Sequence, residues 1–340
     1  MVVSVKTPPI LDVRGLYTHF QTDAGLVRAV DGVTFALEQG VTLGLVGESG
    51  CGKTILCRTL MGLLPRSAKI PDTAQVFFNG TDLRTLAEKA LCKVRGKDVA
   101  MIFQDPLTSL NPVMTVGAQI GESLRLHLGM SKRAARGRSI ELLQAVGIAA
   151  PQRRVDEYPH QLSGGIRQRV AIAIALACEP KLLIADEPTT ALDVTVQSGI
   201  LDLLQREQRE RNMSMILITH DLGVVAGRTD EIAVMYAGKI VERAPTRDIF
   251  ADTRMPYTRA LIDSIPRVDG PVHARLSTIA GQPPNLITPP PGCRFAPRCN
   301  RTQHRCSCEE PSLAATEPAH HSVACWYPMN TPAPTTQPSP

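Results

Sequence analysis

The 340-residue sequence has no apolar run long enough to cross a membrane as a helix. Its longest run, "VAIAIALAC" at 170–178, falls far short of the roughly 20 residues that a membrane-spanning helix needs. No apolar segment follows the N-terminal methionine, so we expect no signal peptide and a chain that stays in the cytosol. Structural disulfides are rare in that compartment.

Cysteine is scarce until late in the chain, where five of the nine cysteines lie between Cys293 and Cys325. Fifteen of the 27 prolines also lie from Pro266 onward. This change in composition predicts a main domain over residues 1–265 and an extension over 266–328. The Pro- and Thr-rich residues 329–340 cannot bury a core and are expected to be disordered.

The sequence also lacks internal repeats, long heptad runs and basic arms. Its net charge is +5, with both signs mixed along the chain, so nothing indicates a nucleic-acid partner.

Short apolar segments alternate with helical ones through the main domain. The segments 41–47, 181–188 and 213–220 are almost wholly apolar until they end, and helical patterns follow the first two. Such strands are typical of a parallel sheet covered on both faces. Residues 131–148 have helical spacing, and we assign them to a helical insertion over about residues 105–165.

Residues 47–54, "GESGCGKT", match the phosphate-binding pattern G-x-x-x-x-G-K-[ST] between an apolar strand and a helix. The glycines let successive backbone N–H groups face an anion at a helix N-terminus. Lys53 is expected to contact the β- and γ-phosphates, and Thr54 to bind Mg²⁺. The predicted phosphate-binding residues are Gly47, Glu48, Ser49, Gly50, Cys51, Gly52, Lys53 and Thr54.

A second chemical element, "LLIADEP" at 182–188, ends an apolar strand with two carboxylates. Asp186 can bind Mg²⁺, and Glu187 can act as general base for a water that attacks the γ-phosphate. Together with the phosphate loop, this pair indicates a nucleotide hydrolase acting on ATP or GTP.

A third element, "QLSGGIRQR" at 161–169, offers Ser163, Gly164 and Gly165 at a helix start, where bare N–H groups can bind another anion. Taken alone, it could equally be a helix cap with flexible glycines. The whole set resembles the nucleotide-binding subunits of ABC transporters, whose signature is LSGG-x-[RQ]-Q-R. Ile166 departs from the usual Gln or Met at its position.

The resemblance implies an α/β fold: a P-loop ABC nucleotide-binding domain with a mixed or parallel sheet core and a helical insertion, plus a small Cys- and Pro-rich C-terminal extension. It also implies ATP and Mg²⁺ as ligands, with Gln104 joining Thr54 and Asp186 at Mg²⁺. Further implied roles are the γ-phosphate contact of His220, the partner-facing position of Asp193, and adenine stacking by an aromatic side chain, Phe20 in preference to Tyr17.

The stretches "FQDPLTSLNP" (103–112), "YPHQLSGGIRQR" (158–169) and "ADEPTTALDVTVQ" (185–197) are similar to the oligopeptide/dipeptide branch of ABC importers. Residues 238–266 resemble that branch's C-terminal extension, although Met255 stands where histidine is usual. The implied partners are a second, related ATPase subunit, two transmembrane permease subunits and, indirectly, an extracytoplasmic solute-binding protein. The implied location is the cytoplasmic face of the inner membrane, as a peripheral subunit.

For the cysteines, the same resemblance implies a [4Fe–4S] cluster on Cys293, Cys299, Cys306 and Cys325. The residues by themselves leave iron–sulfur or Zn²⁺ open, because four soft ligands suit both and the spacing has no tight C-x₂-C pair. Reduced cysteines without metal are a further alternative. Cys308 is then a spare, and His321 an alternative ligand or a hydrogen-bond donor next to the site.

Three functional alternatives remain from the sequence. The imported solute could be nickel or another small molecule instead of a peptide. The chain could be a non-transport ABC ATPase, although it has one phosphate loop and no coiled-coil insertion. The paired ATPase could be an identical chain, and the sequence does not decide whether the cysteine site has a redox role.

Overall fold

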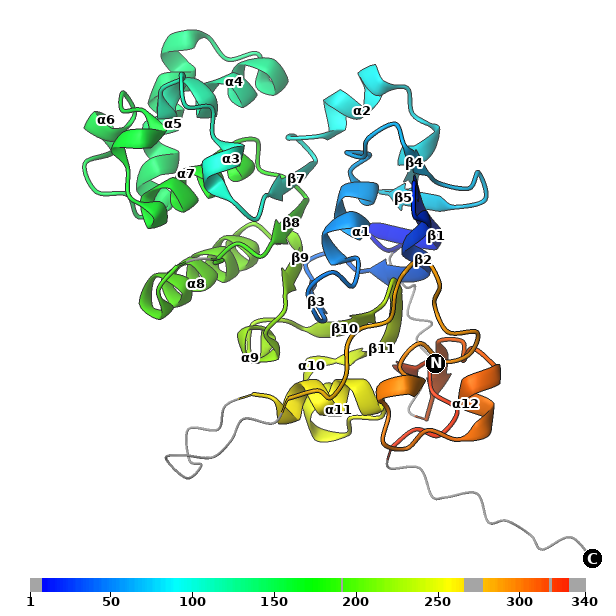
Figure 1. The fold of residues 1–340 in the computed structure, drawn as a ribbon. Coiled ribbons are helices and arrows are strands. Elements are labelled where there is room, and N and C mark those ends of the chain that lie inside the picture. Colours follow the sequence, from blue (N-terminus) through cyan, green and yellow to red (C-terminus); the bar gives the residue numbers. More distant parts are fainter. Residues whose placement is uncertain (1–7, 191, 266–277, 318–319, 330–340) are drawn as a thin grey trace, which may run out of the picture.

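The apolar segments form adjacent strands of one sheet in the computed structural model, which describes residues 8–190, 192–265, 278–317 and 320–329 (Figure 1). The strand order of this eight-stranded sheet is β12-β13-β11-β10-β3-β9-β8-β7. Five consecutive strands of it, ending at the β7 edge, are parallel: β10 (Glu231–Tyr236), β3 (Thr42–Val46), β9 (Ser214–Thr219), β8 (Leu182–Asp186) and β7 (Val99–Ile102). The antiparallel edge consists of β11 (Lys239–Pro245), β13 (His321–Val323) and β12 (Ala314–Thr316).

A second, antiparallel sheet is formed by the N-terminal part of the chain. Its strands are β1 (Leu11–Thr22), β2 (Gly25–Leu37), β4 (Ala68–Lys69), β5 (Gln75–Phe78) and β6 (Thr81–Asp82). The phosphate-loop helix α1 (Lys53–Leu60) packs against this sheet, and Thr59 of α1 shares a buried hydroxyl hydrogen bond of 2.8 Å with Thr18 of β1.

Helices gather on the other side of the parallel sheet, where Figure 1 shows α3 to α7 as a group beyond β7. The helical insertion predicted over about 105–165 contains α3 (Pro106–Ser109), α4 (Val116–Leu128), α5 (Lys132–Ala145) and α6 (Pro151–Arg154). Thr115 and Ser131 begin α4 and α5 by accepting hydrogen bonds from backbone N–H groups three residues later. The domain boundaries themselves stay a prediction.

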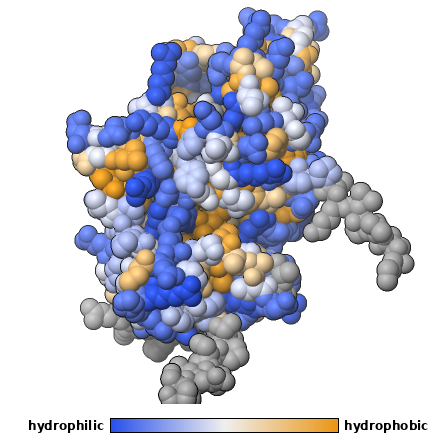
Figure 2. Space-filling view, turned by 90° about the vertical axis from the view of Figure 1, so that its right-hand side faces the viewer, coloured by the Kyte–Doolittle hydropathy of each residue, from blue (hydrophilic) through white to orange (hydrophobic). Residues whose placement is uncertain are grey.

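The remaining helices complete the layers. They are α2 (Glu88–Val94), α7 (Gly164–Leu176), α8 (Val194–Glu210), α9 (Leu222–Val225), α10 (Thr246–Ala251), α11 (Pro256–Asp263), α12 (His304–Cys308) and the short 3₁₀ helices Leu83–Thr85, Pro159–Gln161 and Ala296–Arg298. None of the helices in the described residues is long and apolar enough to cross a membrane. Figure 2 shows one face of the molecule, mostly polar with apolar residues in separate patches.

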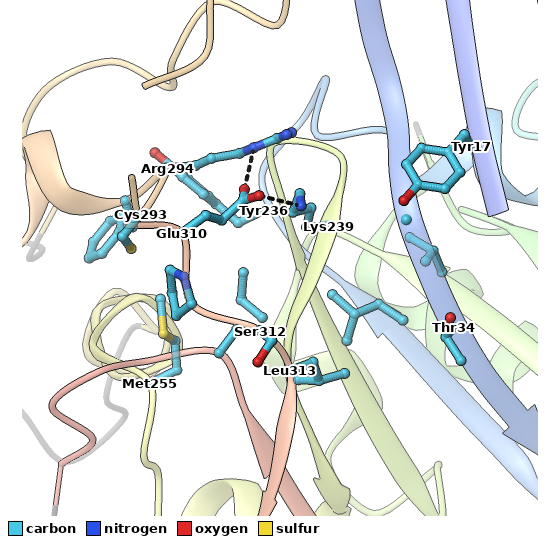
Figure 3. A pocket seen from close by; sticks show the side chains of 17 residues that line it. Tyr17, Thr34, Tyr236, Lys239, Met255, Cys293, Arg294, Glu310, Ser312 and Leu313 are labelled. Atoms are coloured by element: carbon cyan, nitrogen blue, oxygen red, sulfur yellow. Dashed lines mark hydrogen bonds and ion pairs between the residues drawn. The ribbon is translucent and has the colours of Figure 1, made fainter. Parts of the chain in front are cut away.

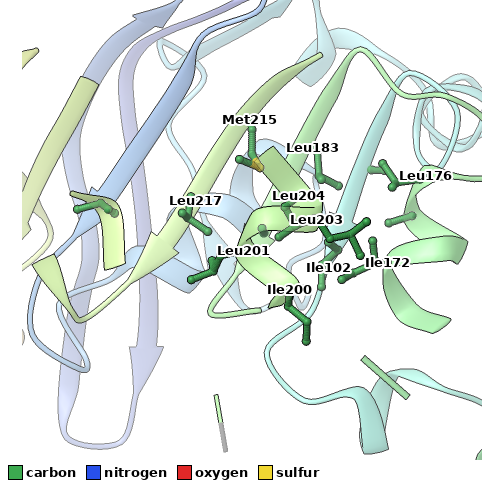
Figure 4. Close-up of a cluster of buried hydrophobic side chains, with 14 of the residues drawn as sticks. Ile102, Ile172, Leu176, Leu183, Ile200, Leu201, Leu203, Leu204, Met215 and Leu217 are labelled. Atoms are coloured by element: carbon green, nitrogen blue, oxygen red, sulfur yellow. The ribbon is translucent and has the colours of Figure 1, made fainter. Parts of the chain in front are cut away.

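The parallel strands are apolar except near their ends, because they separate two cores. In β8, Leu183 and Ala185 pack into the cluster formed with the helices, whereas Leu182 and Ile184 pack into the cluster on the side of α1. Figure 4 shows the first cluster, in which side chains of α7 and α8 lie against β7, β8 and β9. Alternation between two buried faces explains why the interior positions of these strands are apolar.

The C-terminal extension is part of the main sheet in its described residues. Strand β13 pairs with β11, with Val323 opposite Glu242, and both Val323 and Phe295 belong to the larger buried cluster. The extension therefore shares the buried core of the main domain.

A buried polar contact joins the extension to β11. His321, 1% exposed, lies 2.8 Å from Glu242, which is fully buried and also accepts backbone hydrogen bonds from Arg254 and Met255. His321 is thus engaged by Glu242 and does not line the pocket of the cysteines. The second carboxylate oxygen of Glu242, Oε2, has no hydrogen-bond partner among the residues that the structure describes.

We expect His321→Ala to destabilise the protein by about 3–5 kcal/mol, since it leaves the buried Glu242 without its side-chain partner. The neighbouring His320→Ala is the matched control, because His320 is 54% exposed and pairs only with Asp248 at the surface. Urea unfolding of both variants measures the difference. Equal destabilisation by the two changes would contradict a role for the buried pair.

Candidate nucleotide-binding and hydrolytic site

The predicted chemical residues lie at the carboxyl ends of neighbouring parallel strands. Residue 47 follows β3, Asp186 ends β8, Gln104 follows β7 closely and His220 follows β9. These four strands are consecutive in the sheet, in the order β3-β9-β8-β7. Ligands of open α/β sheets bind at this edge, because the loops that leave the strand ends converge there.

The phosphate loop is held closely against the neighbouring backbone. A Cβ on Gly47 would lie 2.1 Å from the carbonyl oxygen of Met235, and one on Gly52 would lie 2.1 Å from that of Ala29. Gly52 also has a φ of 108°. Only glycine is accommodated at these two positions, which explains the pattern of the loop.

Gly52 precedes helix α1 and has no side chain to cap it. No side-chain hydrogen bond therefore caps the first N–H groups of the helix. An uncapped helix start of this kind can bind a phosphate. The Lys53 ammonium donates hydrogen bonds to the carbonyl oxygens of Gly47 (2.7 Å) and Glu48 (3.0 Å). It therefore lies over the loop itself, and binding of a phosphate would replace these carbonyl contacts.

Asp186 is 1% exposed and accepts a hydrogen bond of 3.0 Å from the Thr54 hydroxyl. Burial raises the pKa of Asp186, the Thr54 hydrogen bond lowers it, and the nearby Glu187 raises it further. Hard oxygen ligands of this kind suit Mg²⁺, whose charge would favour the ionised carboxylate. Thr54 and Asp186 are thus placed together as the sequence predicted.

Glu187 is the point where the predicted catalytic residues meet. Its Oε2 atom accepts a hydrogen bond from Gln104 (3.1 Å) and lies 3.3 Å from Nδ1 of His220. Thr190, which the sequence reasoning missed, donates a second hydrogen bond, of 3.0 Å, to the same oxygen. Glu187 has a φ of 45°, in the left-handed region that non-glycine residues seldom adopt.

The signature residues lie apart from the phosphate loop within this chain. Ser163 precedes α7 without forming a side-chain cap, and Ser163 and Gly164 are exposed. Figure 1 shows α7 among the helices of the insertion, away from α1. Asp193 is also exposed and caps α8 through the N–H of Val196 (2.9 Å). These residues are therefore available at the surface of the molecule.

The two candidate aromatic residues differ in position. Tyr17 lines a cavity of about 350 Å³ between the N-terminal sheet and the extension, opposite Arg294 and Glu310 (Figure 3). Phe20 is partly buried, and its backbone pairs with Val27 and Ala68. Tyr17 thus lies beside the extension.

The four predicted cysteine ligands line one small pocket, together with Pro256, Trp326 and Tyr327 among others. Burial raises the pKa of the Cys293, Cys299 and Cys325 thiols, that of Cys325 to about 12, and the neighbouring cysteines raise each of them further. No group of three or more His, Cys, Asp or Glu among the described residues is placed to hold a metal ion. Cys308 is exposed.

The chain matches two protein families and is similar to known transport proteins. The family described as "ABC transporter" matches residues 30–190, and the one described as "Oligopeptide/dipeptide transporter, C-terminal region" matches residues 241–306. The dipeptide transport ATP-binding protein DppD of Bacillus subtilis (strain 168) is 50% identical over 320 residues, which cover 93% of this chain and 94% of the relative. A putative peptide import ATP-binding protein of Brucella melitensis biotype 1 is 50% identical over 317 residues, or 93% of this chain and 95% of its own.

Solved structures agree on the fold. The dimeric post-hydrolysis state of the ATP-binding cassette MJ0796, bound to ADP and Pi, has a TM-score of 0.63 at 26% identity and covers 70% of this chain and 99% of its own. CbiO1 of Clostridium perfringens, described as part of the ABC transporter complex cbiONQ, has a TM-score of 0.61 at 28% identity, with 72% and 92% covered.

We expect Gly47→Ala to abolish measurable binding of Mg·ATP, because the added methyl group would overlap the Met235 carbonyl oxygen and displace the loop. Gly137→Ala is the control, since nothing lies within 4 Å of a Cβ at this helical position. Isothermal titration with the full chain measures both. Unchanged affinity in Gly47→Ala would contradict the assignment of the loop.

Proposed function

Because this chain belongs to the ABC transporter ATPases of the oligopeptide/dipeptide importer family, we propose that its ATP hydrolysis powers the uptake of small peptides. It is an ATPase with a P-loop ABC nucleotide-binding fold. The observation that carries the mechanism is the convergence of Gln104, Thr190 and His220 on one oxygen of Glu187, next to the Thr54–Asp186 pair.

The reaction follows from the positions of these groups. The loop N–H groups and Lys53 bind the β- and γ-phosphates. Thr54, Asp186 and Gln104 are the residues that would hold Mg²⁺, which neutralises charge that develops on the phosphate oxygens. Glu187 accepts a proton from a water molecule while the oxygen of that water bonds to the γ-phosphorus. The bond between the γ-phosphorus and the β–γ bridging oxygen breaks, and ADP leaves.

The nucleotide site is completed by a second ATPase subunit. The exposed Ser163–Gly165 segment lies apart from α1, and its uncapped helix start can contact the γ-phosphate bound to the other subunit. Asp193 then faces the partner across the same interface. We propose Phe20 as the adenine-stacking residue in preference to Tyr17, which lines the cavity next to the extension.

The same role implies two membrane-spanning permease subunits, to which this chain binds at the cytoplasmic face of the inner membrane. A solute-binding protein outside the membrane would deliver the peptide. The relatives' names favour a peptide over nickel, and the permease and binding protein would select it.

We expect Glu187→Gln to lower kcat by about 10²–10⁴-fold, because the water loses its general base, while the affinity for Mg·ATP is retained. The matched control is Glu141→Gln, an exposed residue of α5 that pairs with Arg138. Phosphate release and dipeptide uptake are measured in vesicles that contain the permease subunits and both ATPases. Full turnover in Glu187→Gln would exclude this residue as the base. Uptake of nickel without dipeptide would reject the peptide assignment.

For the extension, we propose a [4Fe–4S] cluster on Cys293, Cys299, Cys306 and Cys325. The support is that all four thiols line one pocket. Four thiolates are the ligands that such a cluster needs, and they also suit a single Zn²⁺.

We expect protein purified without oxygen to contain about four irons and four acid-labile sulfides per chain, following the stoichiometry of such a cluster. Cys299→Ser should lower both contents, whereas Cys308→Ser, at the exposed spare, should not. A content of one zinc per chain would show that the four cysteines bind Zn²⁺ and not a cluster. Absence of all three from the purified wild-type protein would reject a metal site.

A further inference from the structure

The extension contacts the phosphate loop through one buried arginine. The two terminal guanidinium nitrogens of Arg298, Nη1 and Nη2, donate to the carboxylate of Glu48, with distances of 2.6 Å and 2.9 Å. The Arg298 side chain is 4% exposed, and the pair spans 250 positions of sequence. Paired, parallel hydrogen bonds of this kind fix the orientation of both groups.

Arg298 is itself held in place by its surroundings. It donates to the Tyr236 hydroxyl (3.2 Å) and to the carbonyl oxygen of Ala280 (2.9 Å). Its guanidinium lies 5.9 Å from the ring centres of Tyr236 and Phe295. The hydrogen bonds to Glu48 raise the pKa of Arg298, so the charge is retained in this partly buried position.

A second arginine fixes the same segment to β2. Arg294 forms an ion pair with Asp31 and donates to the carbonyl oxygen of Ala237, and it contacts Glu310 at 3.3 Å (Figure 3). The segment from 293 to 298 is therefore fastened at both ends. It can therefore support Glu48, which Arg298 contacts.

Glu48, the second residue of the phosphate loop, is bound on three sides. Its carboxylate is paired with Arg298, its N–H donates to the Tyr257 hydroxyl (2.9 Å), and its carbonyl accepts from Lys53 (3.0 Å). Tyr257 is fully buried, and its ring packs on Tyr236 with centres 4.4 Å apart. The loop conformation around Glu48 is thus set by residues that no phosphate-binding pattern includes.

We propose that Arg298 is a positioning residue for nucleotide binding: it fixes the phosphate loop through Glu48 and neutralises a carboxylate that would otherwise repel the nucleotide's phosphates. The proposal rests on the ATPase role given above and extends it to the C-terminal extension. Arg298 acts through Glu48 and does not itself contact the nucleotide.

The charge argument fixes the direction of the effect. Without Arg298, the Glu48 carboxylate stays in a loop built to receive phosphate, where like charges repel more strongly than in water. Removing the carboxylate as well takes this repulsion away. Nucleotide affinity should therefore fall on loss of the arginine and return on the additional loss of its partner.

The test uses Mg·ADP binding to the full chain, measured by isothermal titration, because ADP occupies the phosphate loop and is not hydrolysed. We expect Arg298→Ala to weaken binding by about tenfold, and Arg298→Lys to recover part of it by restoring the charge without the paired geometry. The double variant Arg298→Ala with Glu48→Gln should bind within about twofold of Glu48→Gln alone.

The matched control is Arg305→Ala, which removes a half-exposed arginine of the same extension that pairs with Glu309. It should leave Mg·ADP affinity unchanged. Thermal unfolding of every variant separates loss of folded protein from loss of affinity, since affinity is measured only on the folded fraction. ATP turnover should show a raised KM with kcat retained, because the loop binds substrate and transition state alike.

Three outcomes would overturn the proposal. Unchanged affinity in a folded Arg298→Ala protein would show that the pair only packs the extension. Strictly additive effects, or a double variant as weak as Arg298→Ala, would show that Arg298 does not act through Glu48. Failure of the wild-type chain to bind nucleotide would instead reject the ATPase function itself, so the two failures are distinguishable.

Discussion

Parallel pairing of β3, β9, β8 and β7 is the constraint on which the rest of the structure depends. It directs four carboxyl strand ends to one edge of the sheet, so groups as far apart in sequence as Gln104 and Glu187 come within 3.1 Å. The pairing requires both faces to be buried, and the two cores that alternate along β8 meet that requirement. The reacting groups thus lie at the ends of strands that are buried on both faces.

The same constraint explains where glycine is needed. Helix α1 must start directly beneath the edge of the sheet, and the loop before it passes against the backbones of β2 and β10. Contact with the carbonyl oxygens of Ala29 and Met235 leaves no room for a side chain at Gly52 and Gly47. Close packing and phosphate binding therefore arise from one local geometry.

The extension builds on this core. It adds β13 to the sheet through β11, buries His321 against Glu242, and reaches the phosphate loop through Arg298. Its cysteines gather beside Phe295, whose ring packs on Tyr236 and Tyr257. A continuous set of packed side chains thus connects the cysteine pocket with Glu48, and the extension bears on the active site and not only on stability.

The sequence by itself determined the parallel sheet, the phosphate loop, and the identity of Asp186 and Glu187, because short-range patterns of apolar residues and glycine encode them. The helix over 131–148 was likewise found as α5 (Lys132–Ala145). Only the tertiary structure decided that Thr190 joins Glu187, that His321 faces Glu242, and that Arg298 reaches Glu48. These contacts depend on how segments distant in the sequence pack together. No local sequence pattern around an arginine or a histidine predicts which residue it contacts. The separation of the Ser163 segment from α1 is of the same kind, since it follows from the placement of a whole group of helices beyond β7.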